Sequence, residues 1–258
     1  PQHFKNNGYE TVSSGKIFHR TGDDPQSWSR ERAVKETEFK RPGSRFALPE
    51  NRERHQKQRE EMVAKYGEAG KRGLSSGPAF EAADVPDHAY PDGYNTEVAI
   101  TTLKQLAANP DKPFFLAMGY HLPHLNWCST QKYWDLYERS EIVLASPSFE
   151  LRVRDGIPKI GPKGDELSTT LLHAYYASTS YIDALIGRLL TTLEEVGEKD
   201  ITMIVCWGDH GWHRCEIFIW GKATNNEIAT RVPLIISTPE MRAKGEGTDA
   251  LVELVDLY

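Results

Sequence analysis

Two parts of this chain show the same succession of sequence patterns. In each, apolar residues at helical spacing are followed by a short apolar run and then by a polar loop. In the first, apolar side chains recur at helical spacing over residues 98–107, Asn109-Pro110 ends the helix, and residues 113–118 form the apolar run. In the second, a helix is predicted over residues 166–195, Gly197 follows it, and residues 201–207 form the next apolar run. This alternation predicts an α/β fold with a largely parallel or mixed central sheet and helices on both faces.

The predicted strands end in polar side chains. Residues 9–17 and 232–236 also have strand-like composition, and residues 201–207 are apolar enough to be buried on both faces. In open parallel sheets, ligands bind beyond the carboxyl ends of the strands. Three of these ends carry the following pairs: Lys16 with His19, His121 with His124, and Asp209 with His210. We therefore expect the three pairs to converge on one site.

Asp209 and His210 follow a strand that is predicted to be buried. There, a carboxylate and an imidazole have to be paired, hydrogen-bonded or bound to a metal ion, because an uncompensated buried charge is costly. The alternative is a structural aspartate that caps the next turn through Gly211.

Lys16 and Lys222 each follow a glycine. Glycine lets the backbone approach a ligand closely, and lysine is a compact charge suited to an oxyanion such as sulfate or phosphate. The alternative is that both lysines point into solvent. His121 and His124 bracket a proline, which fixes the loop, and histidine can transfer a proton near neutral pH. His121, nearest the strand end, is the functional candidate, whereas His124 is expected to pack against Trp127.

Bulk composition limits the classes of function. With 258 residues and 39% hydrophobic side chains, the chain can bury a substantial core. The net charge of −6 gives no long-range attraction for nucleic acid or an anionic membrane, and no apolar run is long enough to span a bilayer. An anionic substrate would therefore need a local basic pocket. Three cysteines are too few and too scattered for a disulfide framework, which leaves the compartment open.

Residues 20–95 hold most of the charge, together with many glycines and prolines. They are predicted to form a loop-rich insertion over the surface, with one short helix near residues 52–66, and their charge is expected to be a solvated face. The chain starts without a targeting signal and ends within a helical pattern. We therefore expect it to be an internal piece of a longer protein.

A set of short motifs extends over nearly the whole chain. In order, they are residues 15–19 (GKIFH), 114–117 (FFLA), 119–124 (GYHLPH), 181–183 (YID), 187–190 (GRLL), 207–212 (WGDHGW), 220–222 (WGK), 229–236 (ATRVPLII) and 251–256 (LVELVD). In this order they resemble the type I sulfatases of the alkaline-phosphatase-like superfamily, and most closely the iduronate-2-sulfatase-like branch. Each motif alone is weak, whereas the ordered set is specific.

The resemblance implies an alkaline-phosphatase-like sulfatase fold and a calcium-assisted site that hydrolyses the sulfate ester of a sulfated saccharide. In this family, a cysteine or serine is converted to formylglycine, which attacks the sulfur. Carried over by position, Asp209 and His210 would be ligands of Ca²⁺. The resemblance also implies export, to a periplasmic, secreted or lysosomal location.

The resemblance assigns four further side chains to the reaction. Lys16 and Lys222 would hold the sulfate oxygens, because preplaced cations stabilise the charge that develops there. His121 would protonate the departing alcohol oxygen or hydrogen-bond to the sulfate. His19 would help the sulfated intermediate to collapse.

The sequence departs from the family pattern at two places. The nucleophile motif, Cys or Ser followed by x-Pro-x-Arg, and the paired aspartates that share the metal are absent, and both would lie upstream of Pro1. We therefore expect a partial catalytic domain that lacks the N-terminal strand with the nucleophile motif and the C-terminal subdomain, binds calcium poorly and is inactive alone. In addition, residues 214–218 (RCEIF) replace the usual Leu-Gly-Glu-His-Gly, and the loss of two glycines is expected to misplace Lys222.

Two other functions stay open. A phosphoester hydrolase of the same superfamily would use the same kind of cationic site. A pseudoenzyme or glycan-binding remnant would keep the fold without turnover. The sequence leaves the particular sugar and the oligomeric state open.

Overall fold

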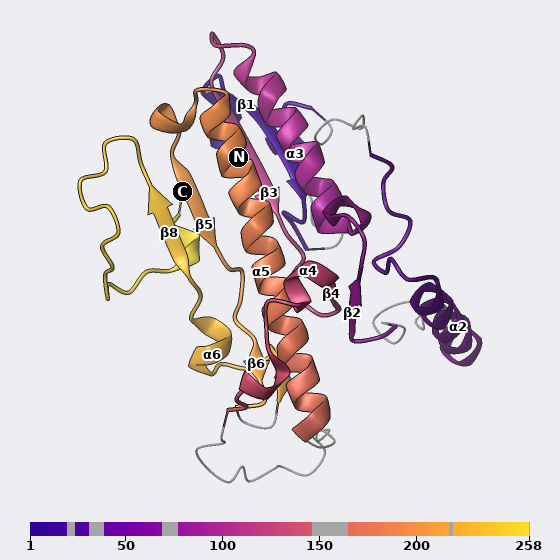
Figure 1. Cartoon of the computed structure of the whole chain (residues 1–258). Coiled ribbons are helices and arrows are strands. Elements are labelled where there is room, and N and C mark those ends of the chain that lie inside the picture. The colour runs from indigo at the N-terminus through magenta and orange to yellow at the C-terminus, as the bar shows by residue number, and fades with distance from the viewer. Residues whose placement is uncertain (20–23, 31–38, 69–76, 146–164, 217–218, 258) are drawn as a thin grey trace.

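The computed structural model describes residues 1–19, 24–30, 39–68, 77–145, 165–216 and 219–257 (Figure 1). The helices are α1 (Gln2–Asn6), α2 (Pro49–Tyr66), α3 (Pro91–Ala107), α4 (Gln131–Trp134), α5 (Asp165–Glu195) and α6 (Glu227–Thr230). The strands are β1 (Glu10–Gly15), β2 (Phe80–Ala83), β3 (Phe114–Gly119), β4 (Trp127–Thr130), β5 (Ile204–Trp207), β6 (His213–Arg214), β7 (Trp220–Gly221) and β8 (Leu234–Ser237).

The described strands form parallel and antiparallel pairs. β1 pairs in parallel with β3, from Glu10 opposite Phe114 to Gly15 opposite Gly119. β2 pairs in parallel with β4, whereas β5–β8 and β6–β7 are antiparallel. Helix α3 packs against the β1–β3 pair, and α5 packs against α3 and β4 (Figure 1). The α/β architecture with mixed strand directions is therefore as the sequence predicts.

Apolar side chains at helical and strand spacing build the core. One cluster joins β1 to α3 through Val12, Tyr94, Val98 and Leu106. The larger cluster surrounds α5 and includes these buried side chains: Phe46, Tyr90, Trp127, Tyr133, Ala174, Ala177, Tyr181, Ile182 and Leu185. α5 therefore packs its apolar stripe against segments from several parts of the chain.

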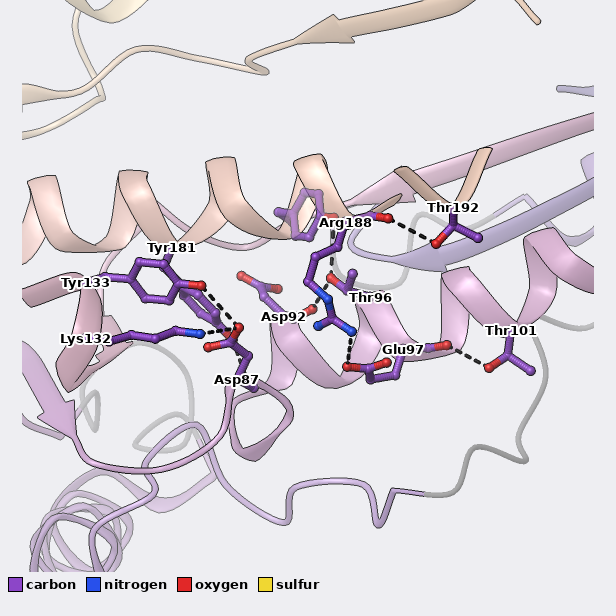
Figure 2. Close-up of polar contacts among 11 residues, drawn as sticks. Asp87, Asp92, Thr96, Glu97, Thr101, Lys132, Tyr133, Tyr181, Arg188 and Thr192 are labelled. Atoms are coloured by element: carbon purple, nitrogen blue, oxygen red, sulfur yellow. Dashed lines mark hydrogen bonds and ion pairs between the residues drawn. The ribbon is translucent and has the colours of Figure 1, made fainter. Parts of the chain in front are cut away.

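Polar contacts fix α3 and α5 relative to each other (Figure 2). Arg188 of α5 forms an ion pair with Glu97 of α3, with 2.7 Å between Nη2 and Oε1. The Tyr181 hydroxyl donates to the backbone carbonyl of Asp87, and Lys132 binds the carboxylate of the same residue at 2.9 Å. These contacts hold the start of α3, from which the candidate site is built.

The structure differs from the sequence prediction in one helix boundary and in the burial of one strand. The helix predicted over residues 98–107 begins earlier, at Pro91, because proline is well tolerated at the first helical position. β5 is not buried on both faces as predicted: it pairs with β8, and Trp207, Ile235 and Ile236 are 42%, 63% and 41% exposed. The error arose because an apolar run shows what can be buried, and not whether a covering layer is present.

Residues 20–95 are more than a solvated surface. The predicted helix is present as α2, and no side chain of α2 is buried. The segments beside it are docked, however, since Phe46 is 1% exposed and Glu81 of β2 is 2% exposed. The prediction that the charge of this region forms a solvated face is therefore wrong for Glu81, whereas the loop-rich insertion stays a prediction. In the part of the chain that the structure describes, no helix is long and apolar enough to cross a membrane.

Candidate active site

The exits of β1 and β3 touch each other through two glycines. Gly15 has a φ of +74°, and a Cβ atom on it would lie 2.0 Å from the carbonyl oxygen of Gly119. A Cβ atom on Gly119 would lie 1.8 Å from the carbonyl oxygen of Lys16. The Lys16 N–H donates to the Gly119 carbonyl at 2.7 Å. Only glycine allows this approach, which brings Lys16 next to the loop that carries His121.

Lys16 also reaches the exit of β5. Its Nζ lies 2.9 Å from Oδ2 of Asp209, so the ends of β1 and β5 meet as predicted. Burial by itself would raise the pKa of Asp209, but the hydrogen bond and charge of Lys16, with smaller effects of His210 and Lys222, hold this pKa below its ordinary value. Because the Asp209 side chain is 62% exposed, solvent screens the pair and its main consequence is positional.

Lys222 reaches the same cluster from the β6–β7 hairpin. The Nδ1 atom of His210 donates to the carbonyl of Gly211 at 2.8 Å, which leaves Nε2 as an acceptor. Nζ of Lys222 lies 2.6 Å from this Nε2 atom, and burial lowers the pKa of Lys222. The expected misplacement of Lys222 is therefore not observed. Cys215, which replaces a glycine of the motif that the sequence resembles, has a φ of +82°, a conformation that glycine adopts more easily.

The histidines complete the cluster. The ring of His124 lies 5.0 Å from that of His121 and 5.9 Å from that of His210, centroid to centroid. It also packs against Trp212 at 5.1 Å, whereas packing against Trp127 was predicted. His124 therefore lies in the cluster, in line with the expected convergence of the three pairs. Burial lowers the pKa values of both His121 and His124. Repulsion from the His124 ring and nearby cations also lowers the pKa of His121, and repulsion from Lys222, His210 and Lys16 also lowers that of His124. These shifts favour the neutral form of both imidazoles at pH 7.

Asp92 holds the turn that presents His121, and sequence reasoning missed it. Its carboxylate, 4% exposed at the start of α3, accepts the backbone N–H groups of His121 at 3.0 Å and Leu122 at 2.9 Å (Figure 2 shows its position). Burial raises the pKa of Asp92 to about 6, although both N–H groups and the charge of Lys16 act against this. The available sequence signal was an acidic residue in the first turn of a proline-initiated helix.

His19 is not brought to this cluster. Its side chain is exposed, and among the described residues no hydrogen bond, ion pair or ring contact joins it to Lys16, His121 or Asp209. A hollow of about 750 Å³ between α3 and α5 is also separate, because it is lined by residues such as Glu97, Lys104 and Arg188 and by no member of the cluster. The cluster is therefore an open surface site at the strand exits.

The described residues do not make up a calcium site. Within the described ranges, no group of three or more His, Cys, Asp or Glu side chains could hold a metal ion. Asp209 is ion-paired with Lys16, and His210 accepts from Lys222. Calcium normally takes six to eight oxygen ligands, so one carboxylate and one imidazole do not fit it.

Comparison with known proteins assigns the family. The family profile described as Sulfatase matches residues 1–258, which is the whole chain. The chain belongs to the sulfatase family. It is 31% identical to iduronate 2-sulfatase of Homo sapiens, over 93% of this chain and 44% of that protein. It is 30% identical to a sulfatase of Formosa agariphila, over 100% of this chain and 50% of that protein. This sulfatase-family chain therefore spans about half the length of the curated relatives it matches.

Solved structures support the same fold. BT4656, solved in complex with its substrate D-glucosamine-2-N,6-O-disulfate, matches 93% of this sulfatase-family chain and 55% of its own, with a TM-score of 0.55 and 18% identity. The phosphonate monoester hydrolase SpPMH of Silicibacter pomeroyi matches 59% of this chain and 33% of its own, with a TM-score of 0.50 and 25% identity. The alkaline-phosphatase-like sulfatase fold predicted from the motifs is thereby confirmed.

Proposed function

We propose that the whole protein hydrolyses sulfate esters of sulfated saccharides, as an iduronate-2-sulfatase-like sulfuric ester hydrolase. The supporting observation is the convergence of Lys16, Lys222 and His121 at the strand exits of a sulfatase-family chain. Two ammonium groups beside neutral imidazoles suit a small tetrahedral anion, because their charge opposes that of the sulfate oxygens.

The geometry supports different roles in the reaction for the two lysines and for the His121 imidazole. Lys16 and Lys222 would hold the sulfate oxygens. Because the pKa of His121 is lowered, a neutral ring that donates a hydrogen bond to the sulfate fits better than a ring that supplies a proton at pH 7. A bound anion would raise this pKa and weaken the distinction.

Three parts of the proposal rest on the resemblance alone. They are the Ca²⁺ ligand roles of Asp209 and His210, the role of His19 in the collapse of the intermediate, and the formylglycine nucleophile. Calcium would need further oxygen ligands from outside the described residues. Family membership likewise supports the proposal of an exported protein, in a periplasmic, secreted or lysosomal location.

The two lysines provide the test. Sulfate release by the whole protein from sulfated monosaccharides is measured for wild type, Lys16→Met and Lys222→Met. Each substitution is expected to lower kcat/KM by roughly 10²- to 10³-fold, as removal of one oxyanion-stabilising group does in other enzymes. Lys104→Met, on the exposed face of α3, is the matched control and should leave kcat/KM unchanged. Full activity in both site variants would refute the proposal.

A second candidate is hydrolysis of phosphate or phosphonate esters. The supporting observations are the likeness to the SpPMH structure and 27% identity to a multifunctional alkaline phosphatase superfamily protein of Trinickia caryophylli. Matched sulfate and phosphate esters of one alcohol distinguish the candidates by the ratio of their kcat/KM values. Saccharide binding without release of sulfate or phosphate would instead favour a pseudoenzyme.

A further inference from the structure

Residues 44–48, from the charged region before α2, form a docked segment beside the candidate site. Phe46 is buried in the main core, and the N–H groups of Ala47 and Leu48 donate to the buried carboxylate of Glu81 at 2.6 and 3.3 Å. Nε of Arg52 donates to the Phe46 carbonyl at 2.9 Å. Because core packing and hydrogen bonds hold this segment, a side chain that it carries is preorganised.

The guanidinium of Arg45 is tied to the loop that carries the site histidines. Its Nη1 atom donates to Oδ1 of Asn126 at 2.6 Å, and Asn126 is 5% exposed. The preceding residue, Leu125, accepts a hydrogen bond at its carbonyl from Nδ1 of His124 at 2.8 Å. Arg45 is therefore linked through adjacent residues to the histidine cluster, and its charge contributes to the lowered pKa of His121.

Most donors of this guanidinium are unused. Arginine has five N–H donors, and in the described part of the chain the Arg45 side chain is exposed and makes only the Asn126 contact. By contrast, several other arginines bind a carboxylate, in the pairs Arg30–Glu10, Arg188–Glu97, Arg214–Glu216 and Arg231–Glu227. A held guanidinium without a carboxylate partner beside a cationic site is arranged for an external anion.

We propose that Arg45 is a specificity-determining residue that binds a second anionic group, a carboxylate or a second sulfate, on a saccharide whose reacting sulfate lies between Lys16 and Lys222. This inference rests on the proposed function. A planar guanidinium matches either oxyanion through two parallel hydrogen bonds, which a lysine cannot reproduce. The substrate class is therefore a sulfated sugar with at least two negative groups.

The test compares substrates that differ only in the second anion. The whole protein and its Arg45→Gln and Arg45→Lys variants are assayed with a monosulfated neutral sugar, the matching sulfated uronic acid and the matching disulfated sugar. Arg45→Gln is expected to lower kcat/KM for one or both dianionic sugars on the order of ten- to hundredfold, mainly through KM, with a several-fold smaller effect on the neutral sugar. Arg45→Lys should restore only part of the loss. Arg54→Gln, on exposed α2, is the control.

The outcomes separate this inference from the proposed function. Equal losses on all three sugars, or no loss on any, would overturn the role of Arg45. If wild type released no sulfate from any sugar, the proposed function would fail. Calorimetric binding of the same sugars to wild type and Arg45→Gln would then still decide the inference, since the expected weakening is specific to dianionic sugars. Loss of binding to the neutral sugar as well would count against it.

Discussion

Asp92 is expected to make the folded protein less stable as the pH rises, whereas most acidic residues have the opposite effect. Burial raises the pKa of its carboxyl in the folded protein from 3.8 to about 6, so the folded state favours the protonated form. The resulting stabilisation is complete below pH 3.8 and is lost as the pH rises through about 6. The shift of roughly two units, at 1.36 kcal/mol each, corresponds to about 3 kcal/mol.

Asp92→Asn is the matched perturbation. In the native turn, one oxygen of Asp92, Oδ2, already accepts both the His121 and the Leu122 N–H groups, at 3.1 and 2.9 Å. An asparagine oxygen can take the same place without a negative charge. We therefore expect the variant to lose the pH dependence that Asp92 causes, and to gain about 3 kcal/mol relative to wild type between pH 4 and pH 8.

The measurement is urea denaturation of the whole protein in steps from pH 4 to pH 8, for wild type, Asp92→Asn and the control Asp111→Asn. Asp111 lies in the exposed turn after α3. The free-energy difference between wild type and Asp92→Asn should grow in favour of the variant from about pH 4 to pH 6 and level off above pH 6. A difference that stays constant within about 1 kcal/mol, or that favours wild type as the pH rises, would refute the argument from burial.

Three further predictions concern the glycine contact, the docked segment and His121. Gly119→Ala should cost roughly 1–3 kcal/mol in thermal unfolding and displace Lys16, because its Cβ atom would overlap the Lys16 carbonyl oxygen. Gly187→Ala, with open space in α5, should instead gain about 0.5–1 kcal/mol, and equal effects would contradict the close approach. Phe46→Ala should cost about 3–5 kcal/mol in chemical denaturation, since Phe46 is fully buried; a loss below about 1 kcal/mol would show that the segment is not docked. NMR titration of His121 should give a midpoint below 6.5 that rises when sulfate is added, whereas an unchanged midpoint would place the anion elsewhere.

The sequence by itself determined the order of the main elements and predicted which strand exits meet. Helical spacing located α3 and α5, and apolar runs located β1, β3, β5 and β8, because these patterns depend on local periodicity. The ordered motifs also indicated the family correctly. Lys16 and Asp209 could be expected to meet although 193 residues separate them, because both follow predicted strands of one sheet.

Only the tertiary structure decided which other side chains join the site. Asp92 acts through a contact across 29 residues, and Arg45 through one across 81 residues, and neither lies at a strand exit. His124 was expected to pack against Trp127, whereas its ring contacts among the described residues are with His121, His210 and Trp212. The exposed face of β5 was equally unpredictable. The physical reason is that composition and periodicity record what a segment can bury or donate, whereas its partner is set by packing between segments that are distant in the chain.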